Sequence, residues 1–126
     1  MVCDSNILIY AAEPGDGLCL PYVQRADAMI ASVTRIEVLG FPRFNLLTPE
    51  QQSRLQTLVA TTTELSLDEE IIRRAIELRQ QKAMKLGDAI IAATALEFGV
   101  PLVTRNEGDF KHIPGLLVIN PFAALP

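Results

Sequence analysis

The 126-residue sequence has no tryptophan, a single histidine and only two cysteines. Cys3 and Cys19 have no paired C-x-x-C spacing, so they fit neither a disulfide framework nor a thiolate zinc site, and we expect both to be reduced and unreactive. No apolar run approaches the ~18 to 20 residues of a membrane span, and the first residues lack the charged-then-apolar layout of a signal peptide. We therefore expect a cytoplasmic protein with no membrane association.

Several catalytic and nucleotide-binding motifs are also missing. The sequence has neither a Walker loop nor G-x-G-x-x-G, so no cradle for a nucleotide cofactor is visible. A Ser-His-Asp or Cys-His mechanism would have to use His112, and there is no nucleophile elbow G-x-S-x-G. A lone histidine in a loop is more often a surface residue than a ligand or a base.

Basic residues are the minority, with 11 lysines and arginines against 15 acids and a net charge of −4. This balance repels a phosphate backbone, so any contact with nucleic acid has to use bound cations or a local basic patch. The length is sufficient to bury roughly two thirds of the surface of the unfolded chain. We therefore expect one domain over residues 1–126.

Short β-type runs alternate with longer helical runs, the pattern of a parallel sheet flanked by helices. We predict strands at 2–4, 29–32, 64–67, 102–104 and 116–119, and helices at 5–12, 19–28, 35–40, 49–61, 68–85 and 88–98. The segment 88–98 is apolar nearly all round, which predicts a helix buried on most sides. Gly99 is expected to end it with a left-handed cap.

Four acids are predicted to meet at one edge of this sheet, because the carboxyl ends of parallel strands and the amino ends of the helices share the edge where ligands bind. Asp4 ends the first strand, Glu37 lies in the first turn of the helix after the second, Asp88 opens the buried helix, and Asp109 follows the strand that ends at Thr104. Carboxylates this close repel each other unless a cation neutralises them. An all-oxygen ligand set suits Mg²⁺ or Mn²⁺, and such a site indicates metal-dependent phosphodiester hydrolysis.

Each acid also has an ordinary structural explanation. Asp4 and Asp88 are placed to cap helices. Thr34 and Glu37 match the capping box S/T-x-x-E, and Asp109 lies in a Gly-containing loop where Asx-turns are common. Spacing alone leaves both explanations open.

Two further groups of charged side chains are explained by solvation. Arg79, Lys82 and Lys85 share one stretch of the helix predicted over 68–85, and Arg105 follows the strand at 102–104. A solvated helix face accounts for them, with phosphate steering as the alternative. The acids at 68–70 likewise read as solvated partners of a helix dipole.

The contexts of the four acids resemble those of PIN domains, specifically the short VapC-type toxins of bacterial toxin–antitoxin pairs. CDSNILIY resembles the family's D-x-N-x-L-x start, and ASVTRIEVLGF is similar to the segment with its glutamate. KLGDAIIAATALEFGVPLVTRNEGDF resembles the segment with the last two acids, and the match covers nearly the whole chain. One departure is Gly87, where many members have proline, a change expected to loosen the turn that sets Asp88.

The resemblance implies a three-layer α/β/α fold with a five-stranded parallel sheet of order 3-2-1-4-5. It implies that Mg²⁺ or Mn²⁺ is held by Asp4, Glu37, Asp88 and Asp109, oriented by Ser5, Asn6, Thr104 and Asn106. It also implies a toxin endoribonuclease that cuts single-stranded RNA, a homodimer, and a small antitoxin that blocks the site.

Two other functions fit the same residues. The acidic pocket could belong to a non-catalytic interaction module that receives basic side chains from a partner. A receiver-type domain in which Asp4 accepts a phosphoryl group is less favoured, because the adjacent D-x-D pair is absent.

Overall fold

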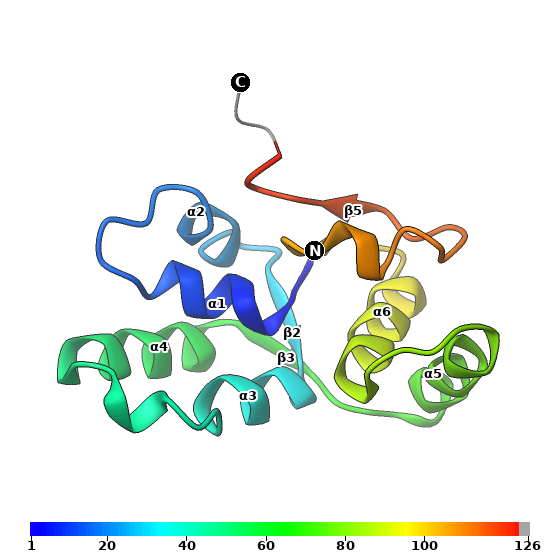
Figure 1. Cartoon of the computed structure of the whole chain (residues 1–126), viewed down its shortest axis with the longest axis horizontal. Helices are drawn as coiled ribbons and strands as arrows, with labels where there is room; N and C mark the ends of the chain where they lie inside the picture. Colours follow the sequence, from blue (N-terminus) through cyan, green and yellow to red (C-terminus); the bar gives the residue numbers. More distant parts are fainter. Residues whose placement is uncertain (124–126) are drawn as a thin grey trace.

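Within residues 1–123, five short parallel strands form one sheet in the order β3-β2-β1-β4-β5 (Figure 1). The computed structural model describes residues 1–123, so the last three residues of the predicted domain 1–126 lie outside the described part. The strands are β1 (Val2–Cys3), β2 (Met29–Ala31), β3 (Thr63–Leu65), β4 (Leu102–Val103) and β5 (Val118–Ile119). The predicted parallel sheet and its order are confirmed.

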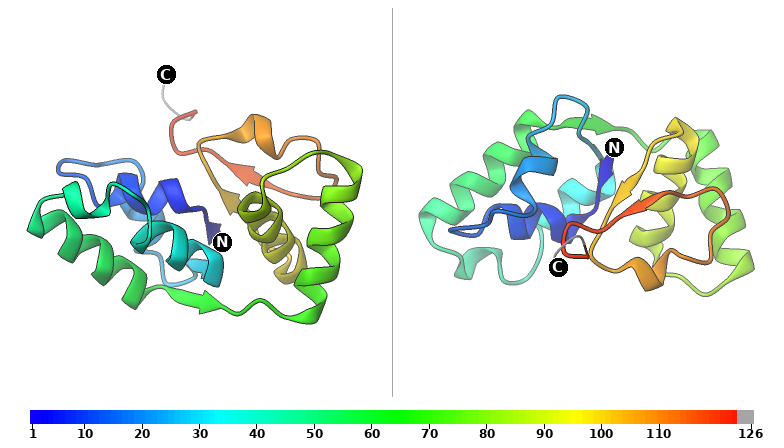
Figure 2. Two further views of the ribbon diagram at one scale, coloured as in Figure 1. Left: turned by 60° about the horizontal axis from the view of Figure 1, so that its bottom comes forward. Right: turned by 90° about the horizontal axis from the view of Figure 1, so that it is seen from above.

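Helices cover both faces of the sheet, which confirms the three-layer α/β/α arrangement (Figure 2). The α-helices are α1 (Ser5–Ala11), α2 (Leu20–Val23), α3 (Ser32–Leu39), α4 (Pro49–Thr61), α5 (Glu69–Gln81) and α6 (Leu86–Phe98). The described part of the chain also contains two 3₁₀ helices that were not expected from the sequence, η1 (Phe44–Leu46) and η2 (Glu107–Asp109). The first two helices and α4 pack on one face, α5 and α6 pack on the other, and α3 contacts helices of both layers.

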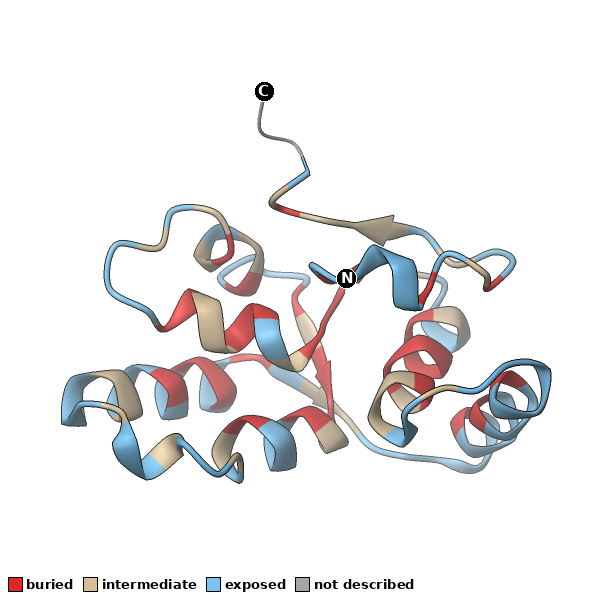
Figure 3. Cartoon of the chain, viewed as in Figure 1, coloured by how far each residue is buried: buried red, intermediate tan, exposed pale blue. Residues whose placement is uncertain are grey.

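The three inner strands β1, β2 and β4 are wholly apolar because both of their faces are covered, whereas the edge strand β3 contains Thr63 and Glu64. Successive side chains on a strand point to opposite faces. Val2 and Leu102 therefore join the core formed with α5 and α6, whereas Cys3 and Val103 join the core formed with α1, α2 and α4. Figure 3 shows the buried residues gathered where the helices face the sheet.

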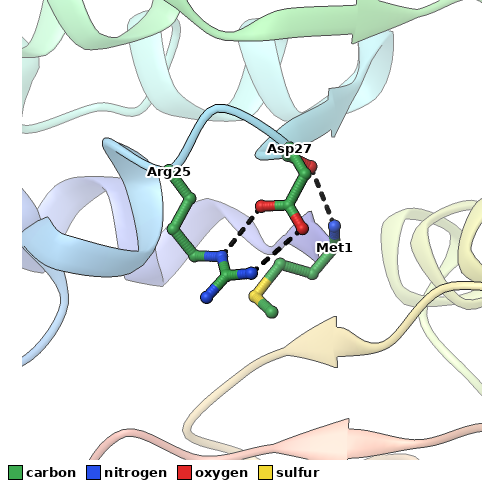
Figure 4. A network of polar contacts seen from close by, with 3 residues as sticks. All are labelled: Met1, Arg25 and Asp27. Atoms are coloured by element: carbon green, nitrogen blue, oxygen red, sulfur yellow. Dashed lines mark hydrogen bonds and ion pairs between the residues drawn. The ribbon is translucent and has the colours of Figure 1, made fainter.

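The start of β1 is tied to the loop that precedes β2 (Figure 4). The Met1 nitrogen donates a hydrogen bond of 2.9 Å to the main-chain oxygen of Asp27, and the Asp27 carboxylate pairs with both Nε and Nη2 of Arg25. Met29 N–H in turn donates to the Met1 carbonyl at 2.9 Å. These contacts set the register of the central strand β1 against its neighbour β2.

The predicted start of α3 at Arg35 is wrong, and so is the capping box. The helix begins at Ser32, directly after β2, so Thr34 lies inside the helix and its hydroxyl has no hydrogen-bond partner in residues 1–123. Glu37 accordingly lies in the second turn rather than the first. The local pattern failed because Ser32 donates to Glu64 at the neighbouring strand, a contact between segments far apart in sequence.

Two other helices are shorter than predicted. The helix predicted at 19–28 ends at Val23, because the chain must turn at Arg25–Asp27 to enter β2. The helix predicted at 68–85 is α5, which has Asp68 as its N-cap and ends at Gln81, so residues 82–85 form an extended connection to α6. That helix starts at Leu86, two residues before the predicted start, and ends as expected at Gly99 in the left-handed conformation.

Both cysteines are free and buried. Burial raises the pKa of the Cys3 thiol to about 12 and that of the Cys19 thiol to about 11, so neither forms a reactive thiolate near neutral pH. A search of residues 1–123 for a helix of the length and apolarity that a bilayer crossing needs finds none.

Candidate active site

The candidate site lies where the direction of the chain across the sheet reverses. The chain moves outward from β1 through β2 to β3, then returns to place β4 on the other side of β1. Side chains that follow β1 and β4 therefore face each other across the crevice where parallel α/β folds bind ligands. Asp4 follows β1 and Thr104 follows β4, and the Thr104 hydroxyl donates a short hydrogen bond to Asp4 Oδ2.

The Asp4 carboxylate is almost fully enclosed, with 6% of the residue exposed. Its Oδ1 accepts a hydrogen bond from the Ile7 N–H at 3.1 Å. Asp4 is therefore the N-cap of α1, in agreement with the predicted capping role. Thr104 Oγ1 also accepts the Asn106 N–H at 3.1 Å, which fixes the hydroxyl that contacts Asp4. The carboxylate is thus held in one orientation from two sides.

Glu37 reaches the same crevice from α3. The Ser5 hydroxyl donates to Glu37 Oε1 at 2.7 Å, which links α3 to the first residue of α1. A Cβ atom on Gly87 would lie 2.8 Å from Glu37 Oε2. Gly87 is the second residue of α6, so the turn that sets Asp88 is the first turn of this helix. The missing side chain of Gly87 admits the Glu37 carboxylate to that turn.

All four predicted acids line one cavity of about 320 Å³, which we call the acidic cavity. The predicted neighbours Ser5, Asn6 and Asn106 line it as well, whereas Thr104 is buried and reaches it through Asp4. Asp88 is the third residue of α6, and Asp109 is the exposed last residue of η2. The structure therefore brings together residues that lie as far apart in sequence as 4 and 109.

The acids of the cavity have no ion-pair partner within residues 1–123. Burial raises the pKa of Asp4 above its ordinary value despite the hydrogen bonds that favour its charged form, and Glu37 adds a smaller upward contribution. Burial also raises the pKa of Asp88, and the nearby Asp109 adds to the increase. The four ion pairs in residues 1–123 involve none of the acids of the cavity.

This donor set fits a hard divalent ion that keeps part of its water. Within residues 1–123, no three His, Cys, Asp or Glu side chains lie close enough to hold one ion directly. Mg²⁺ usually retains several waters and contacts one or two carboxylates, so acids spread around a cavity suit it better than they suit a small, dry cage. Carboxylate oxygens are also the ligands that Mg²⁺ and Mn²⁺ prefer.

Comparison with family models matches residues 1–116 to the PIN domain. The chain belongs to the PIN domain family. Comparison with curated proteins finds no match. The chain is similar in structure to a toxin–antitoxin complex from Klebsiella pneumoniae, with 31% identity, a TM-score of 0.76, and coverage of 95% of this chain and 96% of that one.

Two more distant structures share the fold of this PIN domain. One is VapBC2 from Rickettsia felis bound to a DNA fragment from their promoter, at 21% identity and a TM-score of 0.77, covering 94% of this chain and 96% of that one. The other is FitAcB from Neisseria gonorrhoeae, at 21% identity and a TM-score of 0.73, covering 96% and 97%.

The sequence did not predict one charged residue of the acidic cavity of this PIN domain. Lys85 lines the acidic cavity, although the sequence predicted it on a solvated helix face. The helix α5 ends at Gln81, so Lys85 does not lie on its face. Lys85 is instead the residue just before α6, three positions ahead of Asp88. The available signal was the position of Lys85 beside a helix start that itself carries a candidate ligand.

Proposed function

We propose that this chain is a divalent-metal-dependent endoribonuclease that hydrolyses phosphodiester bonds of RNA. The observation behind the proposal is the convergence of four acids on one cavity at the carboxyl ends of β1 and β4, with no ion pair within residues 1–123 to neutralise them. Buried and clustered carboxylates are costly without a cation. Membership of the PIN family agrees with a nuclease but does not by itself give this chain its substrate.

In this proposal Asp4, Glu37, Asp88 and Asp109 hold Mg²⁺ or Mn²⁺. The ion, when bound, would act as a Lewis acid toward the phosphodiester and lower the pKa of a water ligand. The protein keeps the ligands in place: the Ile7 N–H and the Thr104 hydroxyl hold Asp4, and Ser5 holds Glu37. Such supporting hydrogen bonds orient ligands and tune their basicity.

The remaining polar residues act around these acids. Asn6 and Asn106 line the cavity with amide groups that can hydrogen bond to ligands or to a phosphate oxygen. One of the carboxylates would take the proton from the water that attacks the phosphorus in line, while the phosphorus–oxygen bond to the leaving ribose breaks and solvent protonates the leaving oxygen. Ile9, Phe41 and Ile91 add apolar surface to the same cavity.

We further propose that the chain is the toxin of a type II toxin–antitoxin pair, active in the cytoplasm as a homodimer. The support is its 31% identity, over nearly its whole length, to a protein in a toxin–antitoxin complex. A small antitoxin protein would then block the acidic cavity. If the gene directly upstream encodes a small protein, its co-expression with this chain, followed by size-exclusion chromatography with light scattering, tests both the partner and the dimer.

The nuclease proposal is tested with purified protein and a labelled single-stranded RNA. Cleavage is expected with Mn²⁺ or Mg²⁺ and not with EDTA, and Asp4→Asn is expected to abolish it while leaving the circular dichroism spectrum unchanged. Glu70→Gln is the charge-matched control, since Glu70 lies in the first turn of α5, outside the cavity. Cleavage by Asp4→Asn at the rate of the parent would refute the assignment.

The interaction module is the second candidate, and one observation favours it. No three of the described acids are close enough to hold an ion directly, so the cavity could instead receive a basic side chain. This function predicts no cleavage with any divalent ion, and a partner affinity that falls when Asp88 is neutralised.

A further inference from the structure

A second cavity, of about 250 Å³, adjoins the acidic one. Lys85, Asp88 and Asp109 line both cavities, so the two share a wall made by the start of α6 and the end of η2. The rest of the second cavity is lined by the connection between α5 and α6, by Gly108, and by His112. None of the functions assigned above uses this space.

The three lysines of the chain and its only histidine all lie in the two segments around the second cavity. Lys82 and Lys85 lie in the connection between α5 and α6, and Lys111 and His112 follow η2. Every ion pair in residues 1–123 uses an arginine, so no carboxylate of this part of the chain neutralises Lys82 or Lys85 at ion-pair distance. Two lysines without an ion-pair partner in residues 1–123 therefore line this cavity beside Asp88 and Asp109.

His112 adds hydrogen-bonding groups that have no partner. Both ring nitrogens are shielded from solvent, and neither forms a hydrogen bond within residues 1–123. Buried polar groups without a partner are rare in folded proteins, and each calls for an explanation such as a bound water, ion or ligand. His112 lines the cavity, so a rotation of its ring would bring an N–H to an oxygen of an anion bound there.

We infer that the second cavity is a phosphate subsite, which binds the RNA phosphate next to the one hydrolysed at the acidic cavity. The inference rests on the proposed function. RNA is a polyanion, and a protein of net charge −4 has to meet it through local cations. Lysine is a common phosphate ligand. Lys82 and Lys85 both line the second cavity, and Lys85 also belongs to the wall that this cavity shares with the acidic one.

The shared wall also favours RNA over an acidic protein segment. A carboxylate of a partner protein could pair with the same lysines, but such a contact does not need to lie beside the acidic cavity. Consecutive phosphates of one strand do need neighbouring sites, because each phosphate is covalently linked to the next. Lys82 is accordingly a positioning residue that acts on the substrate away from the reacting bond.

The test compares substrates of two lengths with a matched pair of lysine variants. One substrate is a single-stranded RNA oligonucleotide, and the other is a dinucleotide whose only phosphodiester is the one cut. Lys82→Gln and His112→Phe are expected to raise KM for the oligonucleotide about tenfold, the size of one charge-assisted contact. Both are expected to leave KM for the dinucleotide unchanged. Lys111→Gln, the same charge change outside the cavity lining, is the control.

Ionic strength gives a second readout that a merely structural role would not alter. Each phosphate contact of a single strand contributes about 0.7 to the slope of log affinity against log salt concentration. Lys82→Gln is therefore expected to reduce the slope by about this amount relative to Lys111→Gln. The inference is overturned if either cavity variant has the same KM for the oligonucleotide as Lys111→Gln. It is also overturned if KM for the dinucleotide rises as much as KM for the oligonucleotide.

Failure of the nuclease proposal can be told apart from failure of the subsite. If the parent protein cuts no RNA, the nuclease proposal fails, and the subsite is judged from binding of a fluorescent RNA by anisotropy in EDTA. Weaker binding by Lys82→Gln than by Lys111→Gln then supports the subsite, and equal binding overturns it. If the parent cuts RNA but the two lysine variants behave alike, only the subsite is lost.

Discussion

Replacement of Asp88 by asparagine should stabilise the metal-free protein at neutral pH. Burial raises the pKa of the Asp88 carboxyl, and the repulsion from Asp109, Asp4 and Glu37 raises it further. Lys85 opposes this shift but does not cancel it. Since the folded protein disfavours the charged form, an uncharged side chain of the same shape should relieve the repulsion.

The direction of the stability change follows from the pKa of Asp88 in the folded and unfolded chains. The folded value lies above the ordinary value of 3.8. The proton-linked stabilisation from this group is therefore present below about pH 4 and is lost as the pH rises through the folded pKa. At neutral pH the carboxylate is charged and destabilising, whereas the Asp88→Asn variant has no charge at this position. The advantage of the variant should accordingly shrink as the pH falls toward the ordinary pKa.

The magnitude is small because Asp88 is only half-buried. Screened pairs of partly exposed charges contribute about 0.2–1 kcal/mol each, so the gain in the free energy of unfolding should be about 1 kcal/mol. For a domain of this size that is roughly 3–5 °C in Tm. Mn²⁺ at one hundred times its Kd should stabilise the parent by about 2.7 kcal/mol. The Asp88→Asn variant should lose most of this increment.

Thermal unfolding followed by circular dichroism in EDTA and in Mn²⁺ measures both effects. Glu70→Gln is the matched control, because Glu70 lies in the first turn of α5 as Asp88 lies in the first turn of α6. An acid that only partners a helix dipole contributes about 0.3–1 kcal/mol, so Glu70→Gln should lower Tm slightly in both buffers. If Asp88→Asn also lowers Tm in EDTA, Asp88 is an ordinary helix-start acid and the reasoning fails.

Two further predictions concern the residues that hold the acids. Thr104→Val keeps the side-chain shape but removes the hydroxyl donor from the buried Asp4 carboxylate, so urea denaturation should show a loss of about 2–3 kcal/mol; a loss below about 0.5 kcal/mol would contradict this role. Gly87→Ala should stabilise α6 by roughly 0.5–1 kcal/mol. Its Cβ, 2.8 Å from Glu37 Oε2, should displace that carboxylate and weaken Mn²⁺ binding in calorimetry, whereas Gly17→Ala, where a Cβ meets no atom within 4 Å, should not.

The elements of the fold were largely predictable because their signals are local. Segment 88–98 is apolar all round, and α6 is indeed buried on most sides. The predicted ends of helices were wrong where contacts between residues distant in sequence decide them. The S/T-x-x-E pattern at Thr34 looked like a helix start, but Ser32 bonds across to Glu64 and the helix begins there. The capping box that does form, from Thr48 to Gln51, was not singled out in the sequence.

The site likewise has features that follow from the order of elements along the chain and features that depend on tertiary packing. The shared edge of strand ends and helix starts follows from the alternation of elements, which is why all four acids line one cavity. The approach of Glu37 to Gly87 depends on the packing of α3 against α6, and no spacing rule contains it. The shielded nitrogens of His112 were equally invisible, since a lone histidine in a loop reads as a surface residue.

Capping and metal binding are compatible roles for Asp4, although the sequence presented them as alternatives. A carboxylate has two oxygens with about four acceptor positions in all. The Ile7 N–H uses one position on Oδ1, and the Thr104 hydroxyl uses one on Oδ2. The remaining positions can face the acidic cavity that Asp4 lines. The cap thus fixes the orientation of the carboxylate, and in the proposed function a fixed carboxylate is what an ion with strict geometric demands requires.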